Sequence, residues 1–378
     1  MIVKESSPHI HRKDSLQRML LDVLIALSPV SLTALIVYGL SALRNLLISV
    51  SVMVLCEFIF VLIKNRMPYD GKKHSFKERF THAAKAYRMH NLFAPIISGV
   101  IMALLFPSDS NPGYVIYVAL ILGAVFGIVI GKLVFGGTGQ NIFNPAAVGM
   151  VFAKLCFGSR YVYGTNAYVS VTNAGGTLLS GLTENTSSLI GRYANIGDFS
   201  VLDMFLGRIP GTIGEAFKFA ILIGLIYLLI RRAADWRVIV SYLGGYAFLM
   251  ALAGIFVCTK LPSVNYGQFL AFSLLTGGVL FGATYMLTDP VTMPINAPGR
   301  VMYGLLAAGF TVVIRLFGAL PEGVAFSILL VNLIAPALDH YSYSGNKFTK
   351  KKLLVTGIIL TVFVLAVCLG LGFQEVGA

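Results

Sequence analysis

The sequence predicts an all-α polytopic membrane protein with about ten transmembrane helices, within a range of nine to eleven. Hydrophobic residues make up 57% of its 378 residues, charged residues only 12%, and the mean hydropathy is +0.81. Charged residues form about a quarter of a typical soluble protein, so a water-soluble enzyme is excluded. The net charge of +13 indicates no nucleic-acid partner, because the basic residues stand between long apolar runs.

Apolar runs mark the candidate spans, since a helix needs about 20 residues to cross roughly 30 Å of hydrocarbon. The long runs, in chain order, are 20–42, 45–63, 114–135, 238–258, 267–287 and 353–373. Shorter or interrupted runs, some of which could be half-helices or re-entrant segments, are 92–106, 145–157, 216–230, 301–317 and 323–337. The first run continues as a full span, so no cleavable signal peptide is expected.

Most lysine and arginine residues fall on one side of the membrane when the apolar runs are taken as successive spans. If each run crosses once and the N-terminus is inside, 21 of the 29 basic residues are cytoplasmic, in agreement with the positive-inside rule. The expected parts are a cytoplasmic tail (1–19), a first membrane half (20–157) with a basic cytoplasmic loop (64–91), an extracytoplasmic loop (158–215) and a second membrane half (216–378). We expect a multi-pass protein of a bacterial or archaeal inner membrane.

A short pattern occurs once in each half, at the end of an apolar run. The two copies are Phe135-Gly136-Gly137-Thr138 before Asn144-Pro145, and Phe281-Gly282-Ala283-Thr284 before Asp289-Pro290. Proline breaks a helix and frees polar backbone groups, and paired broken helices in two halves of a membrane protein often mark a central site. Two unrelated helix ends remain the alternative.

The stretch from Val129 to Val148 resembles a signature of the NqrB/RnfD family. It reads Val-Ile-Gly-Lys-Leu-Val-Phe-Gly-Gly-Thr-Gly-Gln-Asn-Ile-Phe-Asn-Pro-Ala-Ala-Val. The family comprises the NqrB subunit of the sodium-translocating NADH:quinone reductase and the RnfD subunit of the Rnf complex. Similar segments follow in the family's order, covering nearly the whole chain: Ser7-Pro8-His9-Ile10, Gly207 to Glu215, Trp236-Arg237, Thr288-Asp289-Pro290-Val291-Thr292, Pro321 to Phe326, Asn332 and Ala335-Pro336. The Ser-Pro-His-Ile opening is more typical of the Rnf subunit.

This resemblance implies a membrane subunit of an ion-translocating oxidoreductase complex, which is not catalytic alone and passes electrons as Na⁺ or H⁺ moves. It also implies sister subunits as partners, surrounding membrane lipid, and FMN joined through its phosphate to a threonine by a flavin transferase. Thr177, within Ala174-Gly175-Gly176-Thr177-Leu178-Leu179, is the expected attachment residue, with Thr183 as the fallback. The acidic residue that precedes this motif in the family is missing here. A flavin-free assembly subunit and a small-solute channel or permease without a redox role are the alternatives.

Other polar residues in the apolar runs have more than one interpretation. A second, non-covalent flavin or an ion path is expected near one set of residues: Gly136, Gly137, Thr138, Asn144, Asp289 and Thr292. Asp22 and Glu57 lie where a carboxylate is costly unless it is paired, protonated or wet, so an ion path and a structural role both stay open. Arg315 either snorkels to the headgroups or pairs with a carboxylate or flavin.

No metal site and no catalytic residue is assigned from the sequence. The six histidines form no ligand triad, and the four cysteines lie far apart without a Cys-x-x-Cys pair. We therefore expect the cysteines to be buried apolar residues.

Overall fold

A computed structural model describes residues 16–65, 76–85, 87, 89–107, 114–157, 193, 200–209, 211–318, 323–340 and 347–373. Regular secondary structure in these ranges is helical only, which confirms the all-α class. The elements are α1 (Leu16–Tyr38), α2 (Leu40–Lys64), α3 (Phe76–Lys85), α4 (Met89–Leu105), α5 (Tyr114–Gly131), a 3-10 turn η1 (Leu133–Phe135), α6 (Pro145–Phe157), α8 (Val201–Leu206), α9 (Lys218–Arg231), α10 (Trp236–Lys260), α11 (Tyr266–Leu275), α12 (Val279–Phe281), a π-helical turn η4 (Gly282–Met286), α13 (Ala297–Phe317), α14 (Val324–Asp339) and α15 (Lys350–Gly372).

Every predicted apolar run coincides with helix. Among the described residues, six helices are long and apolar enough to cross a membrane, namely α1, α2, α5 together with η1, α10, α13 and α15. The pair formed by α11 and α12–η4 is a seventh candidate, bent by 51° at a break. Helices α4, α6 and α14 are apolar but shorter. The polytopic membrane fold is confirmed, and the exact number of crossings stays a prediction.

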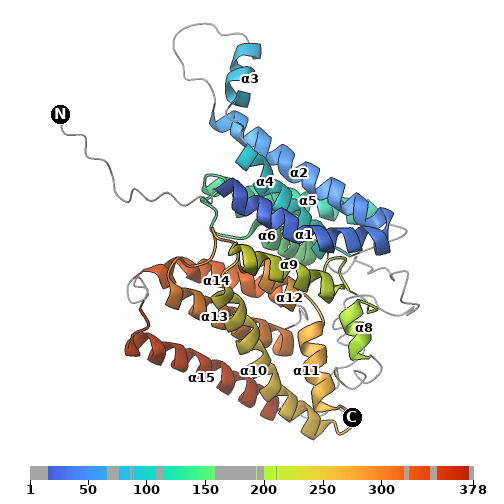
Figure 1. Ribbon diagram of the computed structural model, residues 1–378, viewed down its shortest axis with the longest axis vertical. Coiled ribbons are helices and arrows are strands. Elements are labelled where there is room, and N and C mark those ends of the chain that lie inside the picture. The colour runs from blue at the N-terminus through green and yellow to red at the C-terminus, as the bar shows by residue number, and fades with distance from the viewer. Residues whose placement is uncertain are drawn as a thin grey trace, which may run out of the picture.

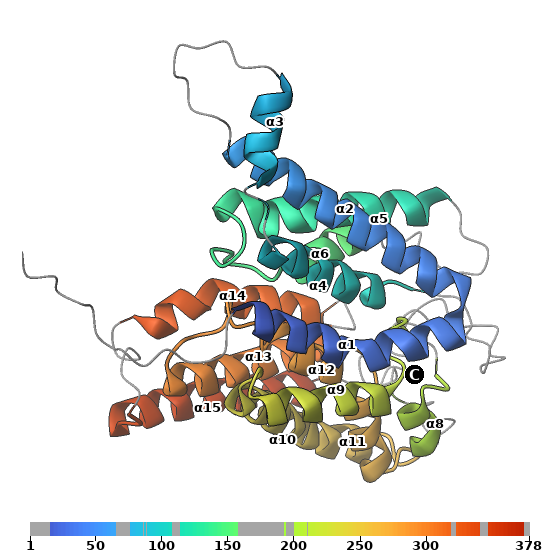
Figure 2. The same ribbon diagram turned by 45° about the horizontal axis from the view of Figure 1, so that its top comes forward.

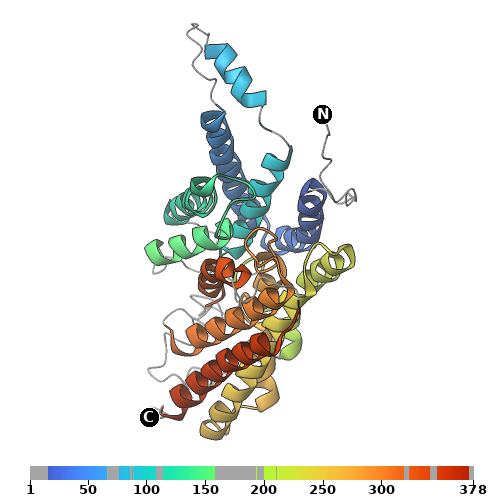
Figure 3. The same ribbon diagram turned by 90° about the vertical axis from the view of Figure 1, so that its left-hand side faces the viewer.

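The helices form two groups that meet along one side (Figure 1). Helices α2, α4, α5 and α6 pack together in the first group, and α9 to α15 form the second. Figure 2 shows the first group above the second, with α1 running between them, and α1 packs against both α4 and α9. Helix α3 projects away from both groups beyond the end of α2 (Figure 3).

Polar contacts fasten α1 to the second group. Asp22 is 7% exposed and accepts hydrogen bonds from the Tyr227 hydroxyl, at 3.0 Å, and from Arg231 Nε, at 3.1 Å. One turn further along, the Tyr285 hydroxyl donates to the Ala26 carbonyl at 2.8 Å. Asp22 therefore has a cationic partner on α9, and its buried carboxylate stabilises the contact between α1 and the second group.

Many large apolar side chains are exposed on the outer helices, as is expected of a chain whose surroundings are hydrocarbon. Helix α15 is the most exposed of these helices, because only 11% of its most apolar 18-residue stretch is buried inside the protein. The cysteines follow the same rule, so the prediction that they are buried was wrong. Cys156 is exposed, and Cys56, Cys258 and Cys368 are half-buried free thiols. An apolar side chain on a membrane helix does not need a protein neighbour.

Candidate functional site

The loop between α5 and α6 turns sharply at its glycine pair. Gly136 and Gly137 have φ values of 121° and 98°, in a region that strongly favours glycine. A Cβ at Gly136 would collide with the Gln140 amide. The Gly136 carbonyl accepts a hydrogen bond from Lys64 Nζ at 2.8 Å. This turn brings Thr138 back against α2.

A buried ion pair lies beneath this loop. Lys132, just after α5, places its Nζ 2.8 Å from Glu57 Oε2, and the two side chains are only 3% and 2% exposed. The Thr138 hydroxyl donates to Glu57 Oε1 at 3.1 Å. The carboxylate that the sequence places inside an apolar run is therefore neutralised by a cation, as a buried charge requires. Sequence analysis did not identify Lys132 as the partner of Glu57.

Asn144 joins the two copies of the repeated pattern. Its side-chain oxygen accepts hydrogen bonds from the Ala146 and Ala147 N–H groups at 3.0 and 3.3 Å, and so caps the start of α6. Its backbone N–H donates to Asn332 Oδ1 at 3.1 Å, and its side-chain nitrogen donates to the Met286 carbonyl at 3.4 Å. Because Met286 ends η4, the broken segments of the two halves lie in direct contact.

Asp289 follows η4 and is half-buried. Its carboxylate accepts hydrogen bonds from the Val291 N–H at 3.1 Å and from the Thr292 hydroxyl at 3.4 Å. Burial raises the pKa of the Asp289 carboxyl, and these hydrogen bonds and the Lys132 ammonium lower it in part. The group combines a fixed position with an environment that favours protonation more than water does.

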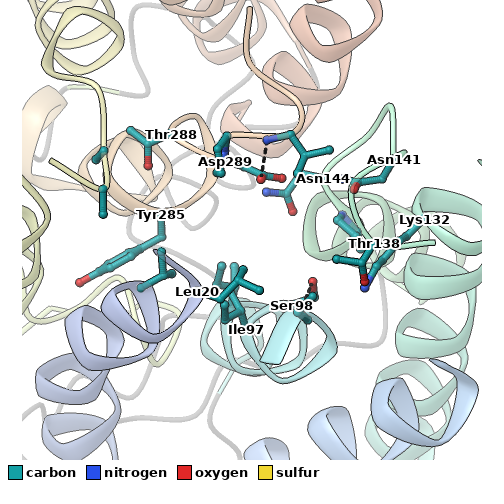
Figure 4. A pocket seen from close by; sticks show the side chains of 18 of the residues that line it. Leu20, Ile97, Ser98, Lys132, Thr138, Asn141, Asn144, Tyr285, Thr288 and Asp289 are labelled. Atoms are coloured by element: carbon teal, nitrogen blue, oxygen red, sulfur yellow. Dashed lines mark hydrogen bonds between the residues drawn. The ribbon is translucent and has the colours of Figure 1, made fainter. Parts of the chain in front are cut away.

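These residues surround a cavity of about 90 Å³ between the two groups of helices, with room for roughly three water molecules at about 30 Å³ each. In Figure 4, Asp289, Asn141 and Asn144 face Leu20, Ile97 and Ser98 across the open space. Helices α1, α4 and α9, the loop before α6 and the segment around η4 all contribute to the wall. The described residues contain no group of three or more His, Cys, Asp or Glu side chains that could hold a metal ion.

The predicted site residues divide into three kinds. Thr138, Asn144 and Asp289 line the cavity. Gly136 and Gly137 shape the loop beside the cavity. Thr292 is 3% exposed, and its hydroxyl donates a hydrogen bond to the Asp289 carboxylate. The two candidate flavin-attachment residues, Thr177 and Thr183, lie outside the described residues. Sequence analysis missed the lining residues Ser98 and Asn141, although each is a polar residue within or beside an apolar run.

A second polar group lies at the break between α11 and α12. Arg315 of α13 is 2% exposed and donates to the Ser273 and Thr276 carbonyls at 2.9 and 3.2 Å, and also to the Tyr246 hydroxyl. These carbonyls end α11, where the helix dipole favours a cation. The interpretation in which Arg315 snorkels to the headgroups was wrong, because the freed carbonyls of the break bind its guanidinium inside the protein.

The opposite side of this break is occupied by an acid. Glu215 is 4% exposed and Lys218 is 1% exposed, and Lys218 Nζ donates to the Glu215 carbonyl. A Cβ at Gly278 would collide with the Glu215 carboxylate, so glycine is needed for their close approach. Glu215 Oε2 has no hydrogen-bond partner among the described residues. The bend is thus held between Arg315 on one side and Glu215 on the other.

Comparison with known proteins shows the family to which this chain belongs. The sequence profile of the NQR2, RnfD, RnfE family matches residues 3–347. The B subunit of the Na(+)-translocating NADH-quinone reductase of Chromohalobacter salexigens is 37% identical over 60% of this chain and 53% of its own length. The chain thus spans about half the length of that relative.

Two further relatives match along most of both chains. The D subunit of the Na(+)-translocating ferredoxin:NAD(+) oxidoreductase complex of Acetobacterium woodii is 30% identical over 92% of this chain and 96% of its own length. The D subunit of the proton-translocating ferredoxin:NAD(+) oxidoreductase complex of Clostridium ljungdahlii is 27% identical over 89% of this chain and 93% of its own length. The two names give different ions, so similarity does not choose between Na⁺ and H⁺.

Proposed function

Because the chain belongs to the NQR2, RnfD, RnfE family, we propose that it is the membrane subunit of an ion-translocating electron-transport complex of the Rnf or Na⁺-translocating quinone-reductase type. Its relatives are subunits of such complexes. The observation that carries the proposal is the cavity at the junction of the two groups, where both broken segments and the Asp289 carboxylate meet. Sister subunits are its partners, and an inner membrane with the N-terminus inside is its location.

The lining of the cavity has the polar and apolar groups that a non-covalent flavin needs, but its volume of about 90 Å³ is below the roughly 300–1,000 Å³ of ligand pockets, so a flavin would enter only with its walls moved apart. Asn141, Asn144 and Ser98 offer amide and hydroxyl groups, while Leu20 and Ile97 offer apolar surface. A flavin ring has hydrogen-bonding groups along one edge and apolar faces, so this lining matches both parts. When bound, a flavin exchanges one or two electrons. The contribution of the chain is to orient the ring and to place the Lys132 and Asp289 charges beside it.

Asp289 is the residue in this arrangement that can take up and release a cation. Glu57 is already paired with Lys132, and Asp22 with Arg231, so both have compensated charges and structural roles. The hydrogen bonds to Asp289 come from neutral groups, a backbone N–H and a hydroxyl. Its negative charge can therefore be balanced by a proton or Na⁺ that enters the cavity wall as an electron arrives.

Replacing Asp289 by asparagine should lower ion-coupled electron transfer by about 10²-fold, the usual contribution of a positioned acid or base. The measurement is donor-to-acceptor electron transfer and ion uptake by the whole complex reconstituted in vesicles. Thr288→Val is the matched control, because Thr288 also lines the cavity but, among the described residues, its hydroxyl bonds only to the Thr284 carbonyl. Unchanged ion uptake in Asp289→Asn would remove Asp289 from the ion path.

A covalent FMN on Thr177, with Thr183 as the fallback, completes the proposal. Its support is the resemblance of the Gly-Gly-Thr-Leu-Leu segment to the family's attachment motif. A hydroxyl that must enter a flavin transferase needs an accessible backbone, and neighbouring glycines supply it. The phosphoester would fix one redox group on this subunit without any pocket of its own.

The expected result is a flavin-fluorescent band from the denatured wild-type chain after co-expression with a flavin transferase, and a dark band from Thr177→Ala. Thr183→Ala is the matched control and should stay fluorescent. Loss of fluorescence only in Thr183→Ala would move the attachment to the fallback residue. A dark wild-type band, with the transferase active on a control substrate, would favour the flavin-free assembly subunit or the permease.

A further inference from the structure

A second cavity, of about 620 Å³, lies where α9 ends and α10 begins. It shares Ala233, Ala234 and Pro290 with the cavity described above, so the two are neighbours across one wall. Its own character is different, because three arginines line it: Arg232, Arg237 and Arg300. None of the functions proposed so far uses these side chains.

The cavity has an excess of positive charge. Asp235 is the acid in its wall, and it forms ion pairs with Arg300 and, at 3.6 Å, with Arg237. Arg300 is further held by the Pro294 carbonyl at 2.9 Å. The Arg232 side chain is exposed and has no partner among the described residues. Three cations against one carboxylate leave two positive charges, which attract an anion and repel Na⁺.

The cavity lies at the end of a candidate membrane span, which places its positive charge at the edge of the membrane. Helix α10 is a candidate span that begins at Trp236, and Trp236 is 58% exposed. The Arg237 guanidinium lies 5.6 Å from the centre of the Trp236 ring. Exposed tryptophan and arginine at a helix end are typical of the headgroup layer. The anion that meets this cavity therefore comes from the level of the lipid headgroups.

An apolar stripe runs along α9, the helix whose last residues line the cavity. Ile223, Ile226 and Ile230 are 52%, 56% and 75% exposed, and their spacing of three and four residues puts them on one helix face. The stripe ends half a turn before Arg232. A ligand with an anionic head and a hydrocarbon tail would match both surfaces at once, whereas a free anion would use only the arginines.

We propose that this cavity binds the phosphodiester headgroup of an anionic phospholipid, with Arg232 and Arg237 on the phosphate and an acyl chain along the isoleucine stripe of α9. Arg300 positions Asp235 and through it the start of α10. Basic pockets between spanning helices bind acidic headgroups in this way. The site is separate from the flavin and ion chemistry proposed above, and it does not depend on it.

The test titrates the purified full-length chain in detergent with phosphatidylglycerol, with phosphatidylcholine of the same acyl chains and with inorganic phosphate. Bound lipid is counted by native mass spectrometry, and the thermal unfolding midpoint is recorded. Phosphatidylglycerol should bind and raise the midpoint, while the other two should not. The double variant Arg232→Asn/Arg237→Gln should bind phosphatidylglycerol about 25-fold more weakly, at about fivefold for each arginine removed.

The matched control is Lys350→Gln/Lys351→Gln, which removes the same charge from exposed lysines at the start of α15 and should bind as wild type does. Arg232→Asn alone is the second variant, because Arg232 adopts φ 55°, which asparagine tolerates, and its side chain has no structural partner among the described residues. Equal binding of phosphatidylcholine, equal stabilisation by phosphate, or undiminished binding in Arg232→Asn would each overturn the proposal. In the intact complex, loss of sister subunits from Arg232→Asn with lipid binding unchanged would also overturn it, because that result would identify a polypeptide as the occupant.

Discussion

Replacing Glu57 by leucine should prevent stable folding, because it leaves the Lys132 ammonium buried without its counter-ion. The two side chains are 2% and 3% exposed, with 2.8 Å between Oε2 and Nζ. Breaking a buried ion pair by removing one partner costs about 3–5 kcal/mol, a large part of the roughly 5–15 kcal/mol by which proteins are stable. The measurement is the yield of monodisperse protein and its thermal unfolding midpoint in detergent.

The double variant Glu57→Leu/Lys132→Met separates the charge from the shape of the site. Apolar replacement of both partners leaves no unpaired ion, so it should recover most of the lost stability. Thr138→Val is the milder control, because it removes only the 3.1 Å hydrogen bond to Glu57, worth about 1.5–3 kcal/mol for a charged acceptor. A double variant as unstable as Glu57→Leu would show that the buried pair is not the reason for the effect.

The second large effect is expected from Arg315→Leu. It removes the donor to the Ser273 and Thr276 carbonyls at the break of the bent span, and to the Tyr246 hydroxyl. Each buried polar group left unpaired costs about 1–3 kcal/mol, so the sum is several kcal/mol. The unfolding midpoint should fall sharply, and proteolysis should become faster near residues 276–278.

Arg315→Lys tests the geometry of this contact. Lysine keeps the positive charge, but a single ammonium replaces the planar fork that reaches two carbonyls, so we expect an intermediate midpoint. Arg208→Leu is the control for losing an arginine, because Arg208 is 54% exposed and pairs with Asp203 at 3.6 Å; it should shift stability by no more than about 1 kcal/mol. A wild-type midpoint in Arg315→Leu would refute the role of Arg315 at the break.

The helices could be predicted from the sequence because hydrocarbon demands long apolar runs, and run length shows directly in the residues. Their ends could not be predicted as well. Runs 20–42 and 45–63 became α1 and α2, which meet at Gly39 with φ 53°. The turn between the two helices consists of a glycine alone, with no polar segment. The residues around it are apolar, so composition does not show where one helix ends and the next begins. The bend within run 267–287 was not predicted either, because the residues at the bend do not interrupt the apolar run.

The candidate site was predicted in part. The repeated pattern found Asn144 and Asp289, because each of these polar residues directly precedes a proline, at the start of α6 and just after η4. The partners of the buried charges were missed, since Glu57 and Lys132 are 75 residues apart along the chain and only packing brings them together. The partners of Arg315 were missed for a related reason: the sequence does not show the carbonyls that a bend in another helix frees.

The contact between Asp22 and Arg231 has a consequence for how the protein is made. The two residues are separated by 209 positions, so at about 5–20 residues per second the ribosome needs on the order of 10–40 s to supply the cation after the acid. Helix α1 is therefore made well before α9, one of the helices against which it packs. Its nascent chain must keep a carboxylate at the membrane edge through that interval, and a fragment that ends before α9 would leave it there without its partner.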